Sequence, residues 1–132
     1  MLIISTFVLF GVVGLVQAKK PRTVANGNWG GQHIQMSVTN GSAEIEYDCA
    51  KGTITGPLKI DTRGRFELRG NHHVEHGGPV RNDEQQQGEP AKYTGWTDGK
   101  KMTLTITLVN SKTEIGTFEL THGSEGRIFK CR

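Results

Sequence analysis

Three histidines and a glutamate cluster in the middle of the chain, in the segment His72-His73-Val74-Glu75-His76. This order matches the H-x-x-E-H motif of one metalloprotease class, in which a helix brings both histidines to one face. Gly70 before the motif and Gly77-Gly78 after it disfavour a helix. On a strand, His72 and His76 would stand about 13 Å apart, too far to share one zinc ion. We therefore expect no metal site and no cofactor, with a looser metal site as the alternative.

The stretch from Glu75 to Arg81 is the strongest candidate for a binding site. Glu75, His76 and Arg81 surround two glycines and a proline, so they could perform acid–base chemistry or hold an anionic group. An ordered turn with a Glu–Arg ion pair is the alternative. No serine stands in a nucleophile-elbow pattern, so we assign no catalytic residue.

The first 18 residues have the pattern of a signal peptide. Leu2 to Val16 carry no charge, and Val16-Gln17-Ala18 ends in small residues suited to cleavage. We expect residues 1–18 to be removed, which leaves a secreted or periplasmic protein without a stable membrane anchor. An uncleaved anchor is the alternative, although the apolar run is short for a bilayer span of about 20 residues.

The two cysteines lie in the exported part of the chain. In an oxidising compartment, Cys49 and Cys131 are expected to form a disulfide, with two buried thiols as the alternative. This pairing leaves no thiol for nucleophilic catalysis. It would close a loop spanning most of the domain, worth roughly 4 kcal/mol if unstrained.

Length and charge limit the classes of partner. The 132 residues allow one domain, and the net charge of +3 equals the contribution of Lys19, Lys20 and Arg22. The remaining charges are balanced and interspersed, whereas a nucleic-acid binder shows a clustered basic face. We therefore expect a basic leader at 19–28, a single domain at 29–132 and no nucleic-acid partner.

Alternation of apolar and polar residues predicts an all-β chain. Asn40-Gly41 indicates a two-residue hairpin turn, and the segment 77–89 is expected to be a long loop. The expected strands are Gln32–Thr39, Ser42–Cys49, Thr53–Asp61, Arg65–His76, Pro90–Trp96, Lys101–Val109, Glu114–Thr121 and Arg127–Cys131.

Eight short strands joined mostly by tight turns favour an up-and-down antiparallel β-barrel, because closure removes the exposed edges of the sheet. A two-sheet sandwich is the alternative. In the barrel, both cysteines, the N-terminal segment and the loop 77–89 are expected at one end. A binding site is expected there too, because long loops often carry function.

Gly27-Asn28-Trp29 resembles the Gly-x-Trp motif of the calycins, which include the lipocalin, fatty-acid-binding and avidin-like barrels. The resemblance implies that Trp29 plugs the barrel floor, with Arg127 as its partner. Segments 29–33, 47–52, 75–81 and 129–131 look like those of a family of small exported bacterial proteins without an assigned activity, which implies a shared fold and export. Tyr-x-Cys with a C-terminal Cys is also similar in outline to exported inhibitors of lysozyme or proteases.

Together these patterns predict a non-enzymatic binding module that recognises a small ligand or a protein at the 77–89 end of the barrel. The candidate residues are Trp29, Glu75, His76 and Arg81, and core packing is the alternative role of Trp29. A secreted inhibitor is the second hypothesis. An enzyme or metal-binding protein using the stretch His72–Arg81 is the third.

Overall fold

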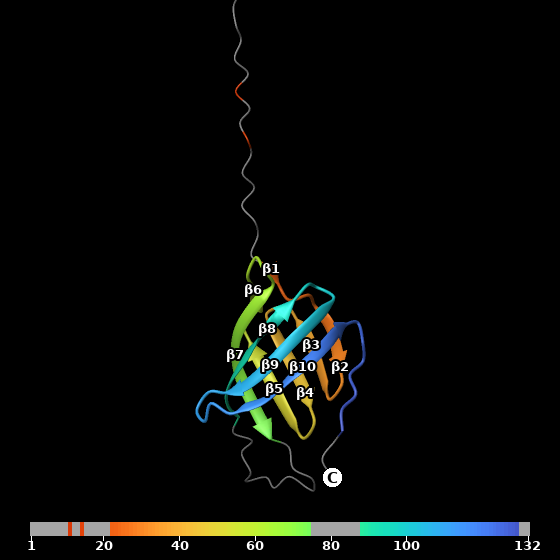
Figure 1. Cartoon of the computed structure of the whole chain (residues 1–132), viewed down its shortest axis with the longest axis vertical. Helices are drawn as coiled ribbons and strands as arrows, with labels where there is room; N and C mark the ends of the chain where they lie inside the picture. The colour runs from red at the N-terminus through yellow and green to blue at the C-terminus, as the bar shows by residue number, and fades with distance from the viewer. Residues whose placement is uncertain (1–10, 12–13, 15–21, 75–87, 130–132) are drawn as a thin grey trace, which may run out of the picture.

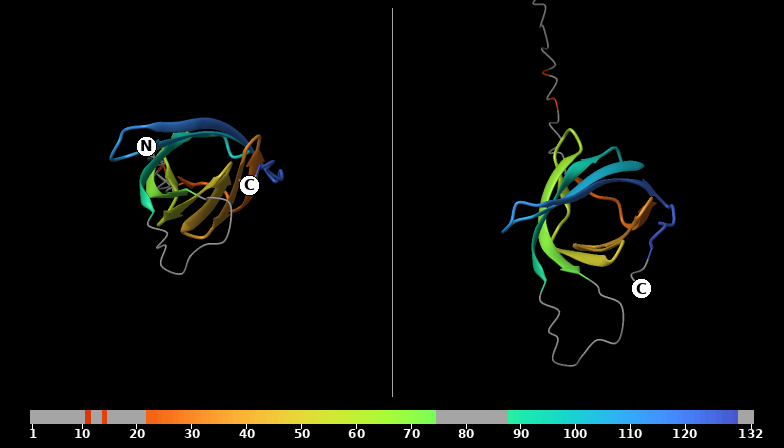
Figure 2. Two further views of the ribbon diagram at one scale, coloured as in Figure 1. Left: turned by 90° about the horizontal axis from the view of Figure 1, so that it is seen from below. Right: turned by 60° about the horizontal axis from the view of Figure 1, so that its bottom comes forward.

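A computed structural model of the chain describes residues 22–74 and 88–129, together with Gly11 and Gly14. Within these ranges the structure is all-β, and it contains no helix long and apolar enough to span a membrane. Eight antiparallel strands close into a barrel in the order β10-β2-β3-β4-β5-β7-β8-β9, and β1 and β6 form a separate two-stranded sheet (Figures 1 and 2). The strands are β1 (Arg22–Thr23), β2 (Gly27–Gly31), β3 (Ile34–Thr39), β4 (Ser42–Tyr47), β5 (Ala50–Thr55), β6 (Lys59–Ile60), β7 (Arg65–Val74), β8 (Glu89–Thr97), β9 (Lys101–Leu108) and β10 (Glu114–His122).

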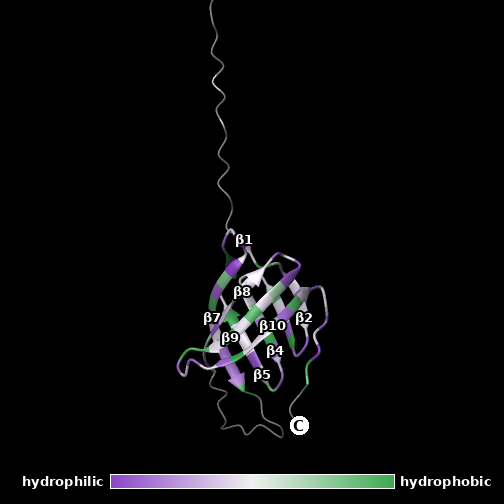
Figure 3. Ribbon diagram, in the orientation of Figure 1, coloured by the Kyte–Doolittle hydropathy of each residue, from purple (hydrophilic) through white to green (hydrophobic). Residues whose placement is uncertain are grey.

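Period-two patterning explains why these segments form strands with one face inside the barrel. Along β4, Ala43, Ile45 and Tyr47 are buried while Glu44 and Glu46 are exposed. The same alternation of apolar and polar residues is visible in the hydropathy of neighbouring strands (Figure 3). The predicted up-and-down barrel is therefore confirmed, and the fold is not the alternative sandwich.

Large side chains fill the interior of the barrel. Trp29, Tyr93 and Ile106 have no solvent exposure, and burying a large apolar side chain contributes about 1.5–3 kcal/mol. Gly52 makes room for one of these rings, because a Cβ atom there would lie 2.1 Å from the Tyr93 hydroxyl oxygen. The described interior is thus a packed core.

The barrel has two different ends. We call the upper end in Figure 1 the turn end; it carries the tight turns at Asn40-Gly41, 61–64 and 98–100. Thr39 pairs with Ser42 across the predicted two-residue turn, in which Gly41 has a positive φ of 81°. We call the opposite end, where β7 finishes and β8 begins, the loop end.

The eighth strand of the barrel differs from the prediction. β2 occupies the place between β3 and β10 that was assigned to Arg127–Cys131. The described part of that segment instead runs beside the turn after β2, where the Arg127 amide donates to the Gly31 carbonyl at 3.0 Å. The apolar alternation of β2 is hidden by its glycines, and the sequence prediction therefore missed it.

Two further expectations about the turn end were wrong. The predicted strand Thr53–Asp61 is interrupted after Thr55, because Gly56 adopts a positive φ and Pro57 has no amide to donate. The N-terminal segment lies at the turn end instead of the loop end, since β1 pairs with β6 there (Figure 1).

Candidate binding face at the loop end

The turn between β4 and β5 organises the loop end. Tyr47 pairs with Ala50, and Cys49 completes this turn with a φ of 61° instead of extending β4 as predicted. Both carboxylate oxygens of Asp48 are hydrogen-bond acceptors in this turn. Asp48 Oδ2 lies 2.5 Å from His33 Nδ1, and Asp48 Oδ1 accepts from the Phe129 amide at 2.8 Å.

His33 is held in place from three sides. Its φ of 65° lies in the left-handed region, which histidine tolerates better than most residues. Its amide donates to the Arg127 carbonyl at 2.7 Å, and its ring centroid lies 5.3 Å from that of Phe129. Asp48, His33 and Phe129 therefore form one connected unit from three distant parts of the sequence.

Two large apolar side chains are exposed here, Phe129 within this unit and Val74 on the neighbouring strand β7. Val74, which pairs with Ala50, is 70% exposed, and Phe129 is 62% exposed. Val74 lies opposite Ala50, the residue that follows the turn at 48–49, and Phe129 is hydrogen-bonded to Asp48 within that turn. We call His33, Asp48, Val74 and Phe129 the turn-48 face.

A buried polar cluster lies inside the barrel beneath this face. Tyr93 donates its hydroxyl proton to the Asn71 carbonyl at 2.7 Å, which leaves the Tyr93 oxygen to accept from Tyr47. Tyr47 then accepts from His72 Nδ1. A single chain of hydrogen bonds thus satisfies both hydroxyl groups.

Burial shifts the titration of this cluster. It raises the pKa of the Tyr93 hydroxyl to about 12, and it also raises the pKa of Tyr47. Burial lowers the pKa of His72, with His73 adding to the shift and Glu89 opposing it. The cluster is therefore uncharged at neutral pH and stabilises the core rather than presenting a charged group.

His73 lies on the other face of β7, packed against the start of the next strand. Its Nδ1 atom is buried and has no hydrogen-bond partner among the described residues. A Cβ atom on Gly88 would lie 2.5 Å from His73 Cε1, so the small residue allows the ring to lie against the backbone. His72 and His73 stand on a strand, as predicted for this part of the H-x-x-E-H motif.

The predicted site residues have different outcomes. Trp29 is fully buried; its Nε1 donates to the Ala25 carbonyl at 2.9 Å and its ring centroid lies 4.8 Å from that of His122. Trp29 therefore belongs to the core and presents no surface to a partner. Arg127, its expected partner, is exposed. Four predicted residues lie outside the described part of the chain: Glu75, His76, Arg81 and Cys131.

The turn-48 face was not predicted from the amino-acid sequence. The family resemblance could have pointed to it. Three of the segments that carry the resemblance contain residues of this face: His33 in 29–33, Asp48 in 47–52 and Phe129 in 129–131. Within residues 22–74 and 88–129, no three side chains of His, Cys, Asp or Glu are grouped so that they could hold a metal ion. Comparisons with protein-family models, curated proteins and solved structures gave no match.

Proposed function

We propose that this chain is an exported, non-enzymatic protein that binds a protein partner through the turn-48 face. The observation that carries this proposal is the exposure of Val74 and Phe129 on either side of one turn. Exposed apolar residues grouped beside polar ones are typical of protein-interaction sites. The filled interior argues against the alternative of a small apolar ligand held inside the barrel.

The geometry of the face suits recognition. Asp48 fixes both the His33 ring and the backbone of Phe129, so these groups lose little further freedom when a partner binds. Aromatic side chains in such positions commonly supply much of the binding energy. Glu75 and His76 follow Val74 directly in the sequence, and with Arg81 they remain predicted binding residues of this end of the barrel.

Export and the Cys49–Cys131 disulfide belong to the same proposal. We infer a secreted or periplasmic protein that begins after Ala18. The hydrogen bond from the Phe129 amide to Asp48 supports the disulfide, because it brings the chain beside Cys49 two residues before Cys131. Two residues span at most about 7 Å, which is compatible with the Cα separation of a disulfide, about 5.5–6 Å.

Photo-crosslinking tests the binding proposal. A photoreactive residue is placed at position 74 or 129 of the exported protein, and the matched control carries it at Trp96, which is 43% exposed near the turn end. In the exported fraction of the host, we expect a specific protein adduct from positions 74 and 129 and none from 96. Excess unlabelled protein should suppress the adduct.

Two surface variants complete the test. Val74→Ser and Phe129→Ser each remove an exposed apolar group, so we expect stability changes within about 0.5 kcal/mol. The double variant should weaken competition for the crosslinked partner at least about tenfold, as expected when two anchors are lost. A partner that crosslinks equally well through position 96, or a double variant that competes normally, contradicts the proposal.

A further inference from the structure

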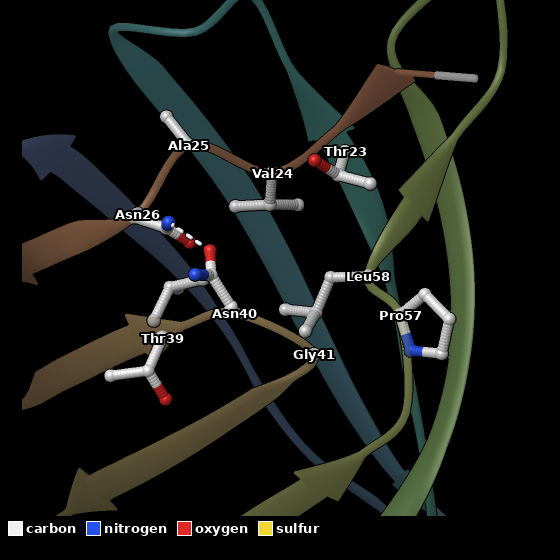
Figure 4. A pocket seen from close by; sticks show the side chains of 10 residues that line it. Thr23, Val24, Ala25, Asn26, Thr39, Asn40, Gly41, Pro57 and Leu58 are labelled. Carbon is white, nitrogen blue, oxygen red and sulfur yellow. Dashed lines mark hydrogen bonds between the residues drawn. The ribbon is translucent and has the colours of Figure 1, made fainter. Parts of the chain in front are cut away.

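A pocket lies at the turn end, at the opposite end of the barrel from the turn-48 face. It has a volume of about 280 Å³ and is bounded by the segment after β1, the β3–β4 turn and the chain between β5 and β6 (Figure 4). The residues that line it are Thr23, Val24, Ala25, Asn26, Val38, Thr39, Asn40, Gly41, Pro57 and Leu58.

The pocket has an amide side and an aliphatic side. Figure 4 shows the amides of Asn26 and Asn40 next to each other, with Leu58 and Pro57 across from them. Asn26 Nδ2 donates to Asn40 Oδ1 at 2.5 Å. This bond uses one hydrogen of one amide and one oxygen of the other, so each amide keeps further donor or acceptor capacity.

The polar groups are held in position by the fold. The hairpin Thr39–Ser42 fixes Asn40, with Gly41 in the left-handed conformation that the turn needs. His122 Nε2 donates to the carbonyl of Asn26 at 2.8 Å, which anchors the second residue of the amide side. A ligand would therefore meet amides that are already oriented.

The chemistry of the lining selects a class of ligand. None of the lining residues is ionisable, so the pocket offers no charged partner to a charged ligand. Two backbone amides at its edge are already paired, because the Val24 amide donates to the Leu58 carbonyl and the Gly56 amide donates to the Gly41 carbonyl. These atoms are therefore not free to bind a peptide strand. Amides opposite aliphatic side chains match a ring that has hydroxyl groups on its rim and C–H groups on its face.

We propose that this pocket binds one ring of a neutral saccharide. The volume of about 280 Å³ accommodates a single hexose. The site is independent of the proposed protein partner, because it is formed by the turns at the other end of the barrel. The chain would then hold a glycan at one end and a protein at the other.

Ligand titrations followed by protein NMR test this site. The probes are glucose, galactose, mannose and N-acetylglucosamine, with glucuronate as a charged analogue. We expect at least one neutral sugar to shift the amide signals of Asn26, Asn40 and Gly41 with a Kd of about 1–10 mM, the range of a few hydrogen bonds and little buried area. Glucuronate should bind more weakly.

Asn40→Gly removes the amide side chain and keeps a residue that the hairpin turn accepts. It should weaken binding about fivefold, the equivalent of one hydrogen bond. The matched control is Asn110→Gly, an exposed turn residue at the loop end that should leave binding unchanged. Absence of shifts with all four neutral sugars at about 50 mM, stronger binding of glucuronate, or unchanged binding by Asn40→Gly overturns the proposal.

Discussion

Replacement of Gly52 by alanine tests whether Tyr93 fills the barrel. The new Cβ atom would lie 2.1 Å from the Tyr93 hydroxyl oxygen, more than 1 Å inside normal contact distance. The ring must therefore move, which costs about 1–3 kcal/mol in a packed core. It also strains the hydrogen bond to the Asn71 carbonyl, which is worth about 1 kcal/mol.

We expect Gly52→Ala to lower the free energy of unfolding by about 2–4 kcal/mol, which is a decrease in Tm of roughly 10–20 °C for a domain of this size. Gly116→Ala is the matched control, because the nearest atoms to its Cβ would be those of the Phe118 ring at 3.2 Å and 3.3 Å, which can adjust. Its effect should stay within about 1 kcal/mol of zero.

A double variant separates this clash from general intolerance of Gly52. Tyr93→Phe deletes the oxygen that the new Cβ atom would meet and should cost about 1 kcal/mol by itself. Gly52→Ala combined with Tyr93→Phe should be at least about 1 kcal/mol more stable than the sum of the single effects. Additive losses in urea unfolding, or a Gly52→Ala protein as stable as Gly116→Ala, would refute the description of a barrel filled by this ring.

Three more predictions concern the loop end. His72 is protonated near pH 6.5 in the unfolded chain and only at lower pH in the folded chain, so the free energy of unfolding should decrease as the pH drops below about 6.5. His72→Gln should weaken this pH dependence of Tm in thermal scans, and a variant with the same pH dependence as the original protein contradicts the prediction. Cys49→Ser and Cys131→Ser should lower stability by similar amounts, up to about 4 kcal/mol, and free thiols in the folded exported protein would rule out the disulfide. Asp48→Ala should speed amide exchange at Phe129 without affecting the turn end, because it removes the acceptor of that amide; unchanged exchange argues against the anchor.

The barrel could be predicted because its strands alternate clearly. Met36 and Val38, Ala43 and Ile45 repeat every second residue on either side of Asn40-Gly41, and each of these apolar residues is buried. This local pattern fixes which face is inside, and the short turn fixes the register.

β2 could not be predicted in the same way. Its sequence is Gly-Asn-Trp-Gly-Gly, so a single large side chain marks the buried face. The segment that contains Phe129 was predicted to be a barrel strand but is not one. It has an apolar residue suitable for a strand, yet its backbone is hydrogen-bonded to Asp48 and to the turn after β2. Which of the two segments enters the barrel depends on tertiary packing and not on local propensity.

The sequence predicted at which end of the barrel a site would lie, but not the residues of the turn-48 face. That end was chosen from the strand order and from the long segment that follows β7. The contact between Asp48 and Phe129 joins residues 81 positions apart, and nothing in the local pattern of either residue indicates the other. Residues that meet through such long-range contacts become visible only in three dimensions.

Hydrogen–deuterium exchange tests the binding proposal most directly. The purified exported protein is compared in buffer and in the exported fraction of its host, and the exchange of each segment is measured by mass spectrometry. We predict slower exchange in segments 31–35, 47–51 and 72–74, with segments 61–64 and 97–101 unchanged. Protection confined to the turn-end segments, or no protection at any segment, would contradict recognition through the turn-48 face.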